Sequence, residues 1–200
     1  MKVLSRYLIA VVFALLVAVP AVANAGSGVS TVNKSIRIDD NSTSGNVDSV
    51  NGSVRIGANA VVKSVDTVNG SIKLDNEVRV ERGVESVNGS VTLEPGCQVD
   101  GDVNTVNGSI RLRETSVGGD VTSVNGAIRL LDATEVTGNV VVRKPGGWSS
   151  NKRRKAVKVE IGENVKVHGD LVFEHAVELT LHDSARVGEI IGEQVTIITK

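Results

Sequence analysis

A stretch of eight residues, 105–112, recurs along this chain at a nearly constant step. It reads Thr-Val-Asn-Gly-Ser-Ile-Arg-Leu, a turn followed by a short strand in which apolar and polar residues alternate. Five further copies lie between residues 31 and 130, 18 or 19 residues apart, with Lys34 replacing the glycine in the first and Ala127 replacing the serine in the last. A short fixed period predicts small structural units stacked on one another.

Each repeat contains three short strand-like runs separated by turns, and its apolar residues keep their place from one repeat to the next. In a parallel β-helix such residues lie above one another at the strand spacing of about 4.8 Å. The sequence therefore predicts an all-β, single-domain parallel β-helix (β-solenoid) at residues 31–200, with about nine coils of 18–19 residues. Its core would be two aliphatic columns: Val47, Val65, Val84, Val103, Val121 and Val140, and Ile38, Ile56, Leu74, Leu93, Leu112 and Leu130.

The last third of the chain lacks the Val-Asn-Gly turn but keeps the strand. Ile161, Leu181 and Ile197 each close an apolar-polar-apolar triplet, and we expect them to continue the second column to nine rungs. The step from Leu130 to Ile161 is about a dozen residues longer than a normal repeat. This excess predicts a loop at residues 143–155, inserted at one corner of the solenoid.

The inserted loop gathers six cations around the single tryptophan of the chain. Extra loop length adds little entropy cost, so a tolerated insertion explains it without any function. The alternative is binding of an anionic envelope polysaccharide or lipid through concentrated charge and an aromatic ring. The candidate residues are Arg143, Lys144, Trp148, Lys152, Arg153, Arg154 and Lys155.

Residues 1–25 have the pattern of a cleaved signal peptide: two basic residues, an apolar run at 8–19 and small residues before the cleavage point. We therefore expect an exported chain, in the periplasm or at the cell surface, that begins with a short leader at 26–30. Without residues 1–25 it carries 20 Lys and Arg against 23 Asp and Glu, a net charge of −3. That charge argues against nucleic acid as a partner.

The repeats resemble two bacterial families. The tandem Val-Asn-Gly-Ser segments resemble the repeats of β-solenoid domains of bacterial adhesin-like proteins, and the Gly-Asp-Val/Leu elements resemble those of bactofilins, which are polymer-forming cytoskeletal β-helix proteins. Together these similarities cover most of residues 31–197. They imply a right-handed β-helix with a structural or adhesive role and no catalysis. The segments are 50–56, 68–74, 87–93 and 106–112 for the first family, and 101–103, 119–121 and 169–171 for the second.

Two polar columns follow from the repeat. The asparagines of the turn are predicted to form a structural ladder, because Asn tolerates a left-handed turn and its amide can bond to the amide in the next coil. They are Asn33, Asn51, Asn69, Asn88, Asn107 and Asn125. A ligand-binding stripe is the alternative for this column.

The second polar column lies between two inward apolar positions and is therefore expected to face outward. Its members are Arg37, Arg55, Lys73, Thr92, Arg111 and Arg129. Stacked cations repel one another unless acids neutralise them. Asp48, Asp66 and Glu85, each three residues before a ladder asparagine, are expected to do so. A basic strip for acidic glycans is the alternative.

Catalysis has to be weighed, because β-helices also carry carbohydrate-active enzymes. Asp100, Asp102 and Asp120 are candidates for a pair of clustered acids, but the repeats offer no aromatic platform for a sugar. The three histidines, at 168, 175 and 182, are seven residues apart, whereas one coil takes about 18 to 20 residues. We therefore expect them on different sides of the solenoid and predict no catalytic, cofactor or metal site.

The only cysteine, Cys97, aligns with Ala60 of an earlier repeat and is predicted to be a buried, inert thiol. Together these features predict an exported, non-catalytic structural or adhesin-like β-solenoid of the bacterial cell envelope, with self-association as an option. The alternatives are a binding module for anionic envelope polymers and a carbohydrate-active enzyme.

Overall fold

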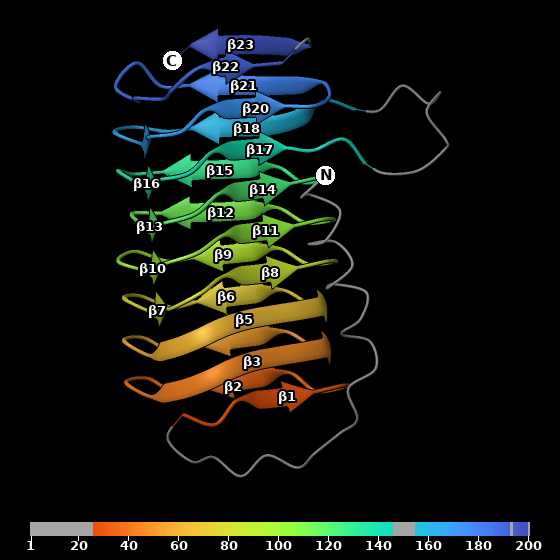
Figure 1. Cartoon of the computed structure of the whole chain (residues 1–200), viewed down its shortest axis with the longest axis vertical. Coiled ribbons are helices and arrows are strands. Elements are labelled where there is room, and N and C mark those ends of the chain that lie inside the picture. The colour runs from red at the N-terminus through yellow and green to blue at the C-terminus, as the bar shows by residue number, and fades with distance from the viewer. Residues whose placement is uncertain (1–25, 146–154, 193, 200) are drawn as a thin grey trace.

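A computed structural model describes residues 26–145, 155–192 and 194–199. The described residues form strands and turns without any helix, and every strand pairing is parallel. The strands stack into one continuous β-solenoid, from β1 at one end to β23 at the other (Figure 1). The predicted all-β, single-domain solenoid is confirmed, with about eight turns.

One side of the solenoid is a nine-stranded sheet that collects the strand after each Val-Asn-Gly turn. Its nine rungs make about eight full turns, close to the nine coils expected. In chain order they are β2 (Ile36–Ile38), β4 (Val54–Ile56), β6 (Ile72–Leu74), β9 (Val91–Leu93), β12 (Ile110–Arg113), β15 (Ile128–Leu131), β18 (Val157–Ile161), β21 (Val177–Leu181) and β23 (Val195–Thr199).

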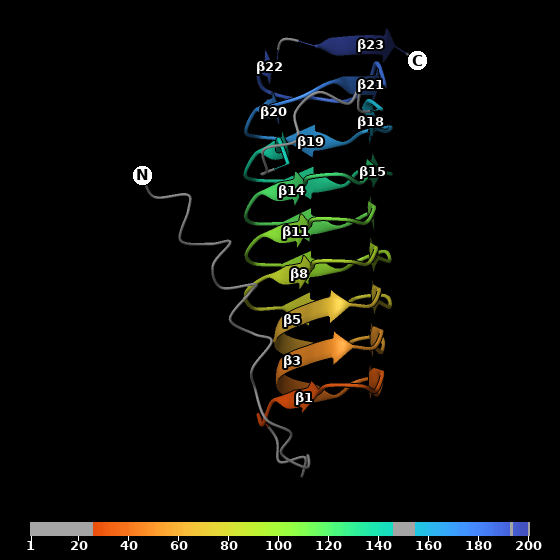
Figure 2. The ribbon, with the colours of Figure 1, turned by 90° about the vertical axis from the view of Figure 1, so that its right-hand side faces the viewer.

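The remaining strands form a fourteen-stranded sheet that runs around the other two sides of each coil. Its main series, seen side-on in Figure 2, is β1 (Val29–Thr31), β3 (Thr43–Asn51), β5 (Val61–Asn69), β8 (Val84–Ser86), β11 (Val103–Thr105), β14 (Val121–Ser123), β17 (Val140–Val142), β20 (Leu171–Phe173) and β22 (Ile190–Ile191). A series of two-residue strands completes it: β7 (Arg79–Val80), β10 (Gln98–Val99), β13 (Ser116–Val117), β16 (Glu135–Val136) and β19 (Lys166–Val167). Each regular coil therefore has the three runs expected from the repeat.

The core is a set of aliphatic columns that run through the stack. All six valines of the first predicted column are 0% exposed, and five of the six residues of the second are at most 1% exposed. Each coil alone has little to bury, so the coils stabilise one another by sharing these columns. Alternation in the strands turns the residue between two core positions outward.

The predicted register fails in the last coil. Ile161 and Leu181 follow Leu130 in the column as expected, but Leu181 pairs with Thr199, and Ile197 pairs with Leu179. A shift of two residues keeps the same side chains facing inward, so the alternating pattern could not detect it. The prediction that Ile197 continues the second column was wrong.

The glycine after each ladder asparagine is required by the stacking of the coils. A Cβ on Gly70 would lie 2.2 Å from the carbonyl oxygen of Gly52, and a Cβ on Gly89 would lie 1.9 Å from that of Gly70. No side chain fits so close to a backbone atom. The first copy can carry Lys34 at this position, because it has no earlier copy of the repeat against its back.

Left-handed backbone occurs in a different turn, the one that follows each strand of the nine-stranded sheet. Asn59 (φ 57°), Glu77 (φ 58°), Gly96 (φ 80°) and Glu114 (φ 48°) occupy it in successive coils. None of the six ladder asparagines has a positive φ. The ladder position therefore does not use the left-handed backbone that asparagine tolerates, and the side chain must explain why asparagine recurs there.

Candidate functional site

The six asparagines lie in one exposed column and are joined by side-chain hydrogen bonds. In each of the five steps, Nδ2 of one asparagine donates to Oδ1 of the asparagine in the preceding coil, at 2.8 or 2.9 Å. Each inner amide therefore gives one hydrogen bond and receives another. This arrangement links neighbouring coils and uses one of the two N–H donors and one of the two lone pairs of each inner amide, which favours the predicted structural ladder.

The basic column is exposed on the outer face of the nine-stranded sheet. Arg55 Nε lies 2.8 Å from Asp75 Oδ2, Lys73 Nζ lies 3.2 Å from Glu94 Oε1, and Arg129 Nε lies 3.5 Å from Glu160 Oε2. Acids that follow the strand or occupy the column itself thus compensate these cations. This pairing favours a charge-balanced surface over a strip for acidic glycans.

The acids that the sequence suggested for this role lie elsewhere. Asp48, Asp66 and Glu85 occupy the outward position of β3, β5 and β8 in the fourteen-stranded sheet, where they stand one above another. The expectation that they neutralise the basic column was wrong, because residues seven positions apart in one coil lie on different sides of the solenoid. They form an acidic column of their own.

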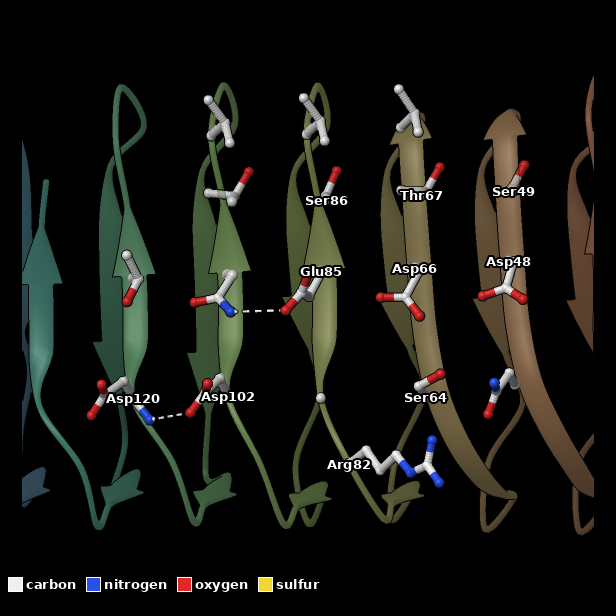
Figure 3. A pocket seen from close by; sticks show the side chains of 18 of the residues that line it. Asp48, Ser49, Ser64, Asp66, Thr67, Arg82, Glu85, Ser86, Asp102 and Asp120 are labelled. Carbon is white, nitrogen blue, oxygen red and sulfur yellow. Dashed lines mark hydrogen bonds between the residues drawn. The ribbon is translucent and has the colours of Figure 1, made fainter. Parts of the chain in front are cut away.

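The acidic column forms the floor of a groove of about 480 Å³ (Figure 3). One flank is a row of valines two residues after the floor position, Val68, Val87 and Val106. The other flank lies two residues before it and includes Ser64, Gly83, Asp102 and Asp120. Toward the C-terminus the floor continues with Asn104 and Thr122, so the acidic part of the floor is confined to three coils.

The hydrogen bonds of the acidic column are few. Ser30 Oγ donates to Asp48 Oδ2 at 3.0 Å, and Asn104 Nδ2 donates to Glu85 Oε1 at 3.2 Å. Asp48 Oδ1 is buried and has no partner when both aspartates are ionised. When Asp66 is protonated, the carboxyl groups of Asp48 and Asp66 can hydrogen-bond to each other, and Ser64 also bonds to Asp66. Among the described residues, no Lys or Arg side chain lies within 4.0 Å of the carboxylates of Asp48, Asp66 and Glu85.

Burial makes Asp48 and Asp66 harder to ionise than exposed carboxylates. Burial, together with the charges of Glu85 and Asp48, raises the pKa of Asp66 to about 7. Burial also raises the pKa of Asp48, although the hydrogen bond from Ser30 opposes the effect. Because the groups interact, their protons belong to the column rather than to one residue.

The sequence did not predict this groove. The outward positions of neighbouring strands are visible in the repeat, but no single column of outward residues reveals a groove. Reading Ser64, Asp66 and Val68 as three adjacent outward columns would have shown a polar row, an acidic row and an apolar row side by side.

The predicted basic loop lies mostly outside the described residues. Trp148, Lys152, Arg153 and Arg154 belong to the segment 146–154, so their part in a site stays a prediction. Arg143 is half-buried and lines the acidic groove at its C-terminal end, whereas Lys144 and Lys155 are exposed. The backbone N–H of Lys144 donates to Glu174 Oε2 at 2.9 Å.

The carboxylates considered for catalysis have structural partners. Asp102 Oδ1 accepts a hydrogen bond from the backbone N–H of Asp120 at 2.9 Å, and Asp120 Oδ1 accepts one from the N–H of Asn139 at 2.8 Å. The third, Asp100, lies 2.8 Å from Arg79 Nη2. These contacts tie one coil to the next.

The three histidines have separate partners. Nε2 of His168 lies 2.6 Å from Glu135 Oε1, Nε2 of His175 lies 3.1 Å from the carbonyl oxygen of Val124, and Nδ1 of His182 lies 2.8 Å from Ser184 Oγ. Within the described ranges, no group of three His, Cys, Asp or Glu residues is arranged to hold a metal ion.

Cys97 is buried in the column that begins with Ala60, as predicted. Its Sγ donates to the carbonyl oxygen of Asp75 at 3.0 Å. Burial raises the pKa of the thiol to about 11, which keeps it protonated and unreactive at neutral pH.

No family model, curated protein or solved structure matches this chain. The resemblances to adhesin-like domains and to bactofilins therefore rest on the repeat motifs, and the β-solenoid itself is what the structure shows. In the part of the chain that is described, no helix is long and apolar enough to cross a membrane.

Proposed function

We propose that this protein is an exported, non-catalytic structural or adhesin-like β-solenoid of the bacterial cell envelope, and that it self-associates through its C-terminal coil. The fold supports a structural role, because its regular features are core columns and ladders that join one coil to the next. The signal-peptide pattern of residues 1–25 supports export.

The observation that carries self-association is the exposed apolar face of the last described coil. Ile197 faces inward on β23 but is 51% exposed, whereas its column neighbour Leu179 is 0% exposed. Ile191 and Ile198 of the same coil are exposed too. Within the described residues, no strand pairs with the outer edge of β22 or β23. An apolar end with free backbone groups is a surface on which a second copy can continue the stack.

Size measurements on the purified exported chain test this proposal. We expect light scattering to give a mass above that of one chain, and electron microscopy to show particles longer than a single solenoid. Ile197→Lys places a charge on the end face and should yield monomers. Thr196→Lys changes an outward residue of the same strand and is the matched control, which should still associate. A monomeric wild-type protein at high concentration would contradict self-association.

Cell fractionation tests the location. The chain should appear in the periplasm or on the surface of a bacterial host, and loss of residues 1–25 should retain it in the cytoplasm. Folded protein that stays cytoplasmic with residues 1–25 intact would rule out the envelope role.

A further inference from the structure

The turns that carry the asparagine ladder contain a dipeptide with a reactivity of its own. Five of the six ladder asparagines are followed by glycine, and only Asn33 is followed by another residue, Lys34. In an Asn-Gly pair the backbone nitrogen of glycine can attack the side-chain carbonyl carbon of asparagine, because glycine has no Cβ that hinders the approach. The five asparagines are exposed at the corner of the solenoid where β3, β5, β8, β11 and β14 end (Figure 1).

The reaction of an Asn-Gly pair consumes water and releases ammonia. The glycine nitrogen loses its proton and forms a bond to Cγ of asparagine. The bond between Cγ and Nδ2 breaks, and the Nδ2 group takes up that proton and leaves as ammonia. Water then opens the cyclic imide at one of its C–N bonds, which gives aspartate or isoaspartate. This spontaneous deamidation is one reason why asparagine is a thermolabile residue.

The backbone hydrogen bonds of the glycines divide the five turns into two groups. The N–H of Gly52 donates to the carbonyl oxygen of Asn69 at 3.1 Å, and the N–H of Gly126 donates to Ser123 Oγ at 3.0 Å. These bonds hold the attacking nitrogen in place in the first and last Asn-Gly turns. Three glycine N–H groups donate to no described residue, and they belong to Gly70, Gly89 and Gly108. The middle three turns therefore lack this restraint.

In the middle turns the ladder itself holds the reacting side chain. Asn88 Nδ2 donates to Asn69 Oδ1 at 2.9 Å, and Asn107 Nδ2 donates to Asn88 Oδ1 at 2.8 Å. The attack requires Cγ to turn toward the following nitrogen, so the side chain of Asn88 has to leave both partners. Nδ2 is also the leaving group of the reaction. Loss of two hydrogen bonds should slow the reaction by at least about tenfold.

We propose that Asn69, Asn88 and Asn107 are latent deamidation sites, which the ladder keeps unreacted while the coils are stacked. Reaction at one site should release the next. A carboxylate has no N–H to donate, so aspartate at position 88 would leave Asn69 Oδ1 without its donor. Isoaspartate also adds a carbon to the backbone of the turn, which displaces the side chain from the column and frees both neighbours.

Peptide mapping by mass spectrometry of the full exported chain tests the proposal. The chain is incubated warm at mildly alkaline pH, and the map identifies each asparagine that has become an acid. A sample unfolded in guanidinium chloride gives the rates without a ladder, and there all five Asn-Gly pairs should react at similar rates. In the folded chain the same pairs should react at least about tenfold more slowly.

Asn107→Ala separates the ladder from folding in general. It removes one hydrogen bond from Asn88, which precedes a glycine with a free N–H, and one from Asn125, which precedes Gly126. Deamidation of Asn88 should become about fivefold faster than in the folded wild type. Asn125 should keep its rate, because the N–H of Gly126 stays bonded to Ser123 Oγ. The variant thus contains its own control.

Two further variants complete the comparison. Asn33→Ala removes the hydrogen bond from Asn51 Nδ2, but the N–H of Gly52 remains bonded, so Asn51 should keep its rate. Ser71→Ala changes an exposed residue of a ladder turn without breaking the ladder and should leave every rate unchanged. Circular dichroism confirms that each variant is folded before its rates are compared.

Equal rates in the folded and unfolded chain would overturn the proposal. An unchanged rate at Asn88 in folded Asn107→Ala would also overturn it, because the ladder would then not be the restraint. Equal acceleration of Asn88 and Asn125 would mean that the glycine N–H bonds have no part in the selection of sites. If Asn107→Ala does not fold, Asn51→Ala gives the same test, since it removes a hydrogen bond from Asn69, whose Gly70 N–H is free.

Discussion

The two sheets of the solenoid carry opposite charge on their outer faces, and they differ in whether neighbouring side chains neutralise it. On the nine-stranded sheet, Arg55 and Lys73 are about half exposed and lie within 4 Å of Asp75 or Glu94. On the fourteen-stranded sheet, Asp48 and Asp66 are more deeply buried and have no cation as near among the described residues. Both columns repeat at the same rung spacing, so stacking alone does not explain the difference.

The comparison shows that a column of like charges stays an ordinary solvated surface when the neighbouring column carries opposite charges. Without such charges, the same arrangement gives carboxylates with raised pKa values. Where acids follow the strand, the cations form ordinary surface ion pairs, each worth little. Where the neighbours are valines, Asp48 and Asp66 lose solvent without gaining a cationic partner, and their pKa rises. The first face is a solvated surface, whereas the second is a partly buried groove.

Removal of the central acid should have the largest effect on this contrast. The pKa of Asp66 is about 7 in the folded chain against an ordinary 3.8, so at pH 8 the folded state carries the cost of ionising it. Asp66→Asn should raise the free energy of unfolding at pH 8 by on the order of 2–4 kcal/mol. Urea unfolding measures the change, and Asp183→Asn is the exposed control.

The same variant should alter how the free energy of unfolding depends on pH. Between pH 7 and about 4 the folded wild type binds a proton at Asp66 that the unfolded chain does not bind, so stability should increase as pH falls through this window. Asp48, Glu85 and Ser64 interact with this carboxyl, and Asp48, whose pKa is also raised, reinforces the trend. Asp66→Asn should flatten it. A wild type that loses stability steadily from pH 8 to pH 5 would contradict the assignment.

The repeat predicted the features that depend on stacking alone. Val65 and Leu74 keep one place in every coil, so their columns could be read from the period, and so could the position of Asn69 beside Asn51. The groove depends on how three outward columns together exclude solvent, and a period does not contain that information. The end register failed at Ile197 for a related reason, since alternation cannot distinguish a shift of two residues.

The partners of the basic column were predictable in principle. Asp75 follows Leu74 directly and Glu94 follows Leu93 directly, which places an acid at the end of two neighbouring strands. Asp48, Asp66 and Glu85 were instead predicted as the partners because they recur at the period of the repeat. The loop at 143–155 offered no such route, because a segment that occurs once has no repeat from which its position can be inferred.

A cation placed in the acidic column should make this face more like the basic face, with a smaller effect on the free energy of unfolding than Asp66→Asn. Asn104 already donates to Glu85 at 3.2 Å, so the ammonium of Asn104→Lys can take that place. We expect an increase of about 1 kcal/mol in the free energy of unfolding at low salt and an apparent pKa of Asp66 closer to its ordinary value. Thermal or urea unfolding at two salt concentrations measures the first effect. Asn107→Lys, on the exposed ladder, is expected to destabilise the chain because it removes two hydrogen bonds between side-chain amides.

Removal of an acid that neutralises the basic column should have the smallest effect on the free energy of unfolding. Asp75→Asn removes the carboxylate that lies 2.8 Å from Arg55 Nε and 3.9 Å from Lys73 Nζ. Because both cations are about half exposed, solvent takes over most of the interaction, and the free energy of unfolding should fall by about 0.5–1 kcal/mol at low salt. The difference should vanish in high salt, where the charges are screened. Asp39→Asn is the matched control, because Asp39 follows Ile38 in the first coil as Asp75 follows Leu74, and it should change little. If Asp75→Asn still lowers the free energy of unfolding in high salt, the ion pairs of the basic face are not ordinary screened surface pairs. The contrast between the two faces would then not come from compensation by neighbouring charges.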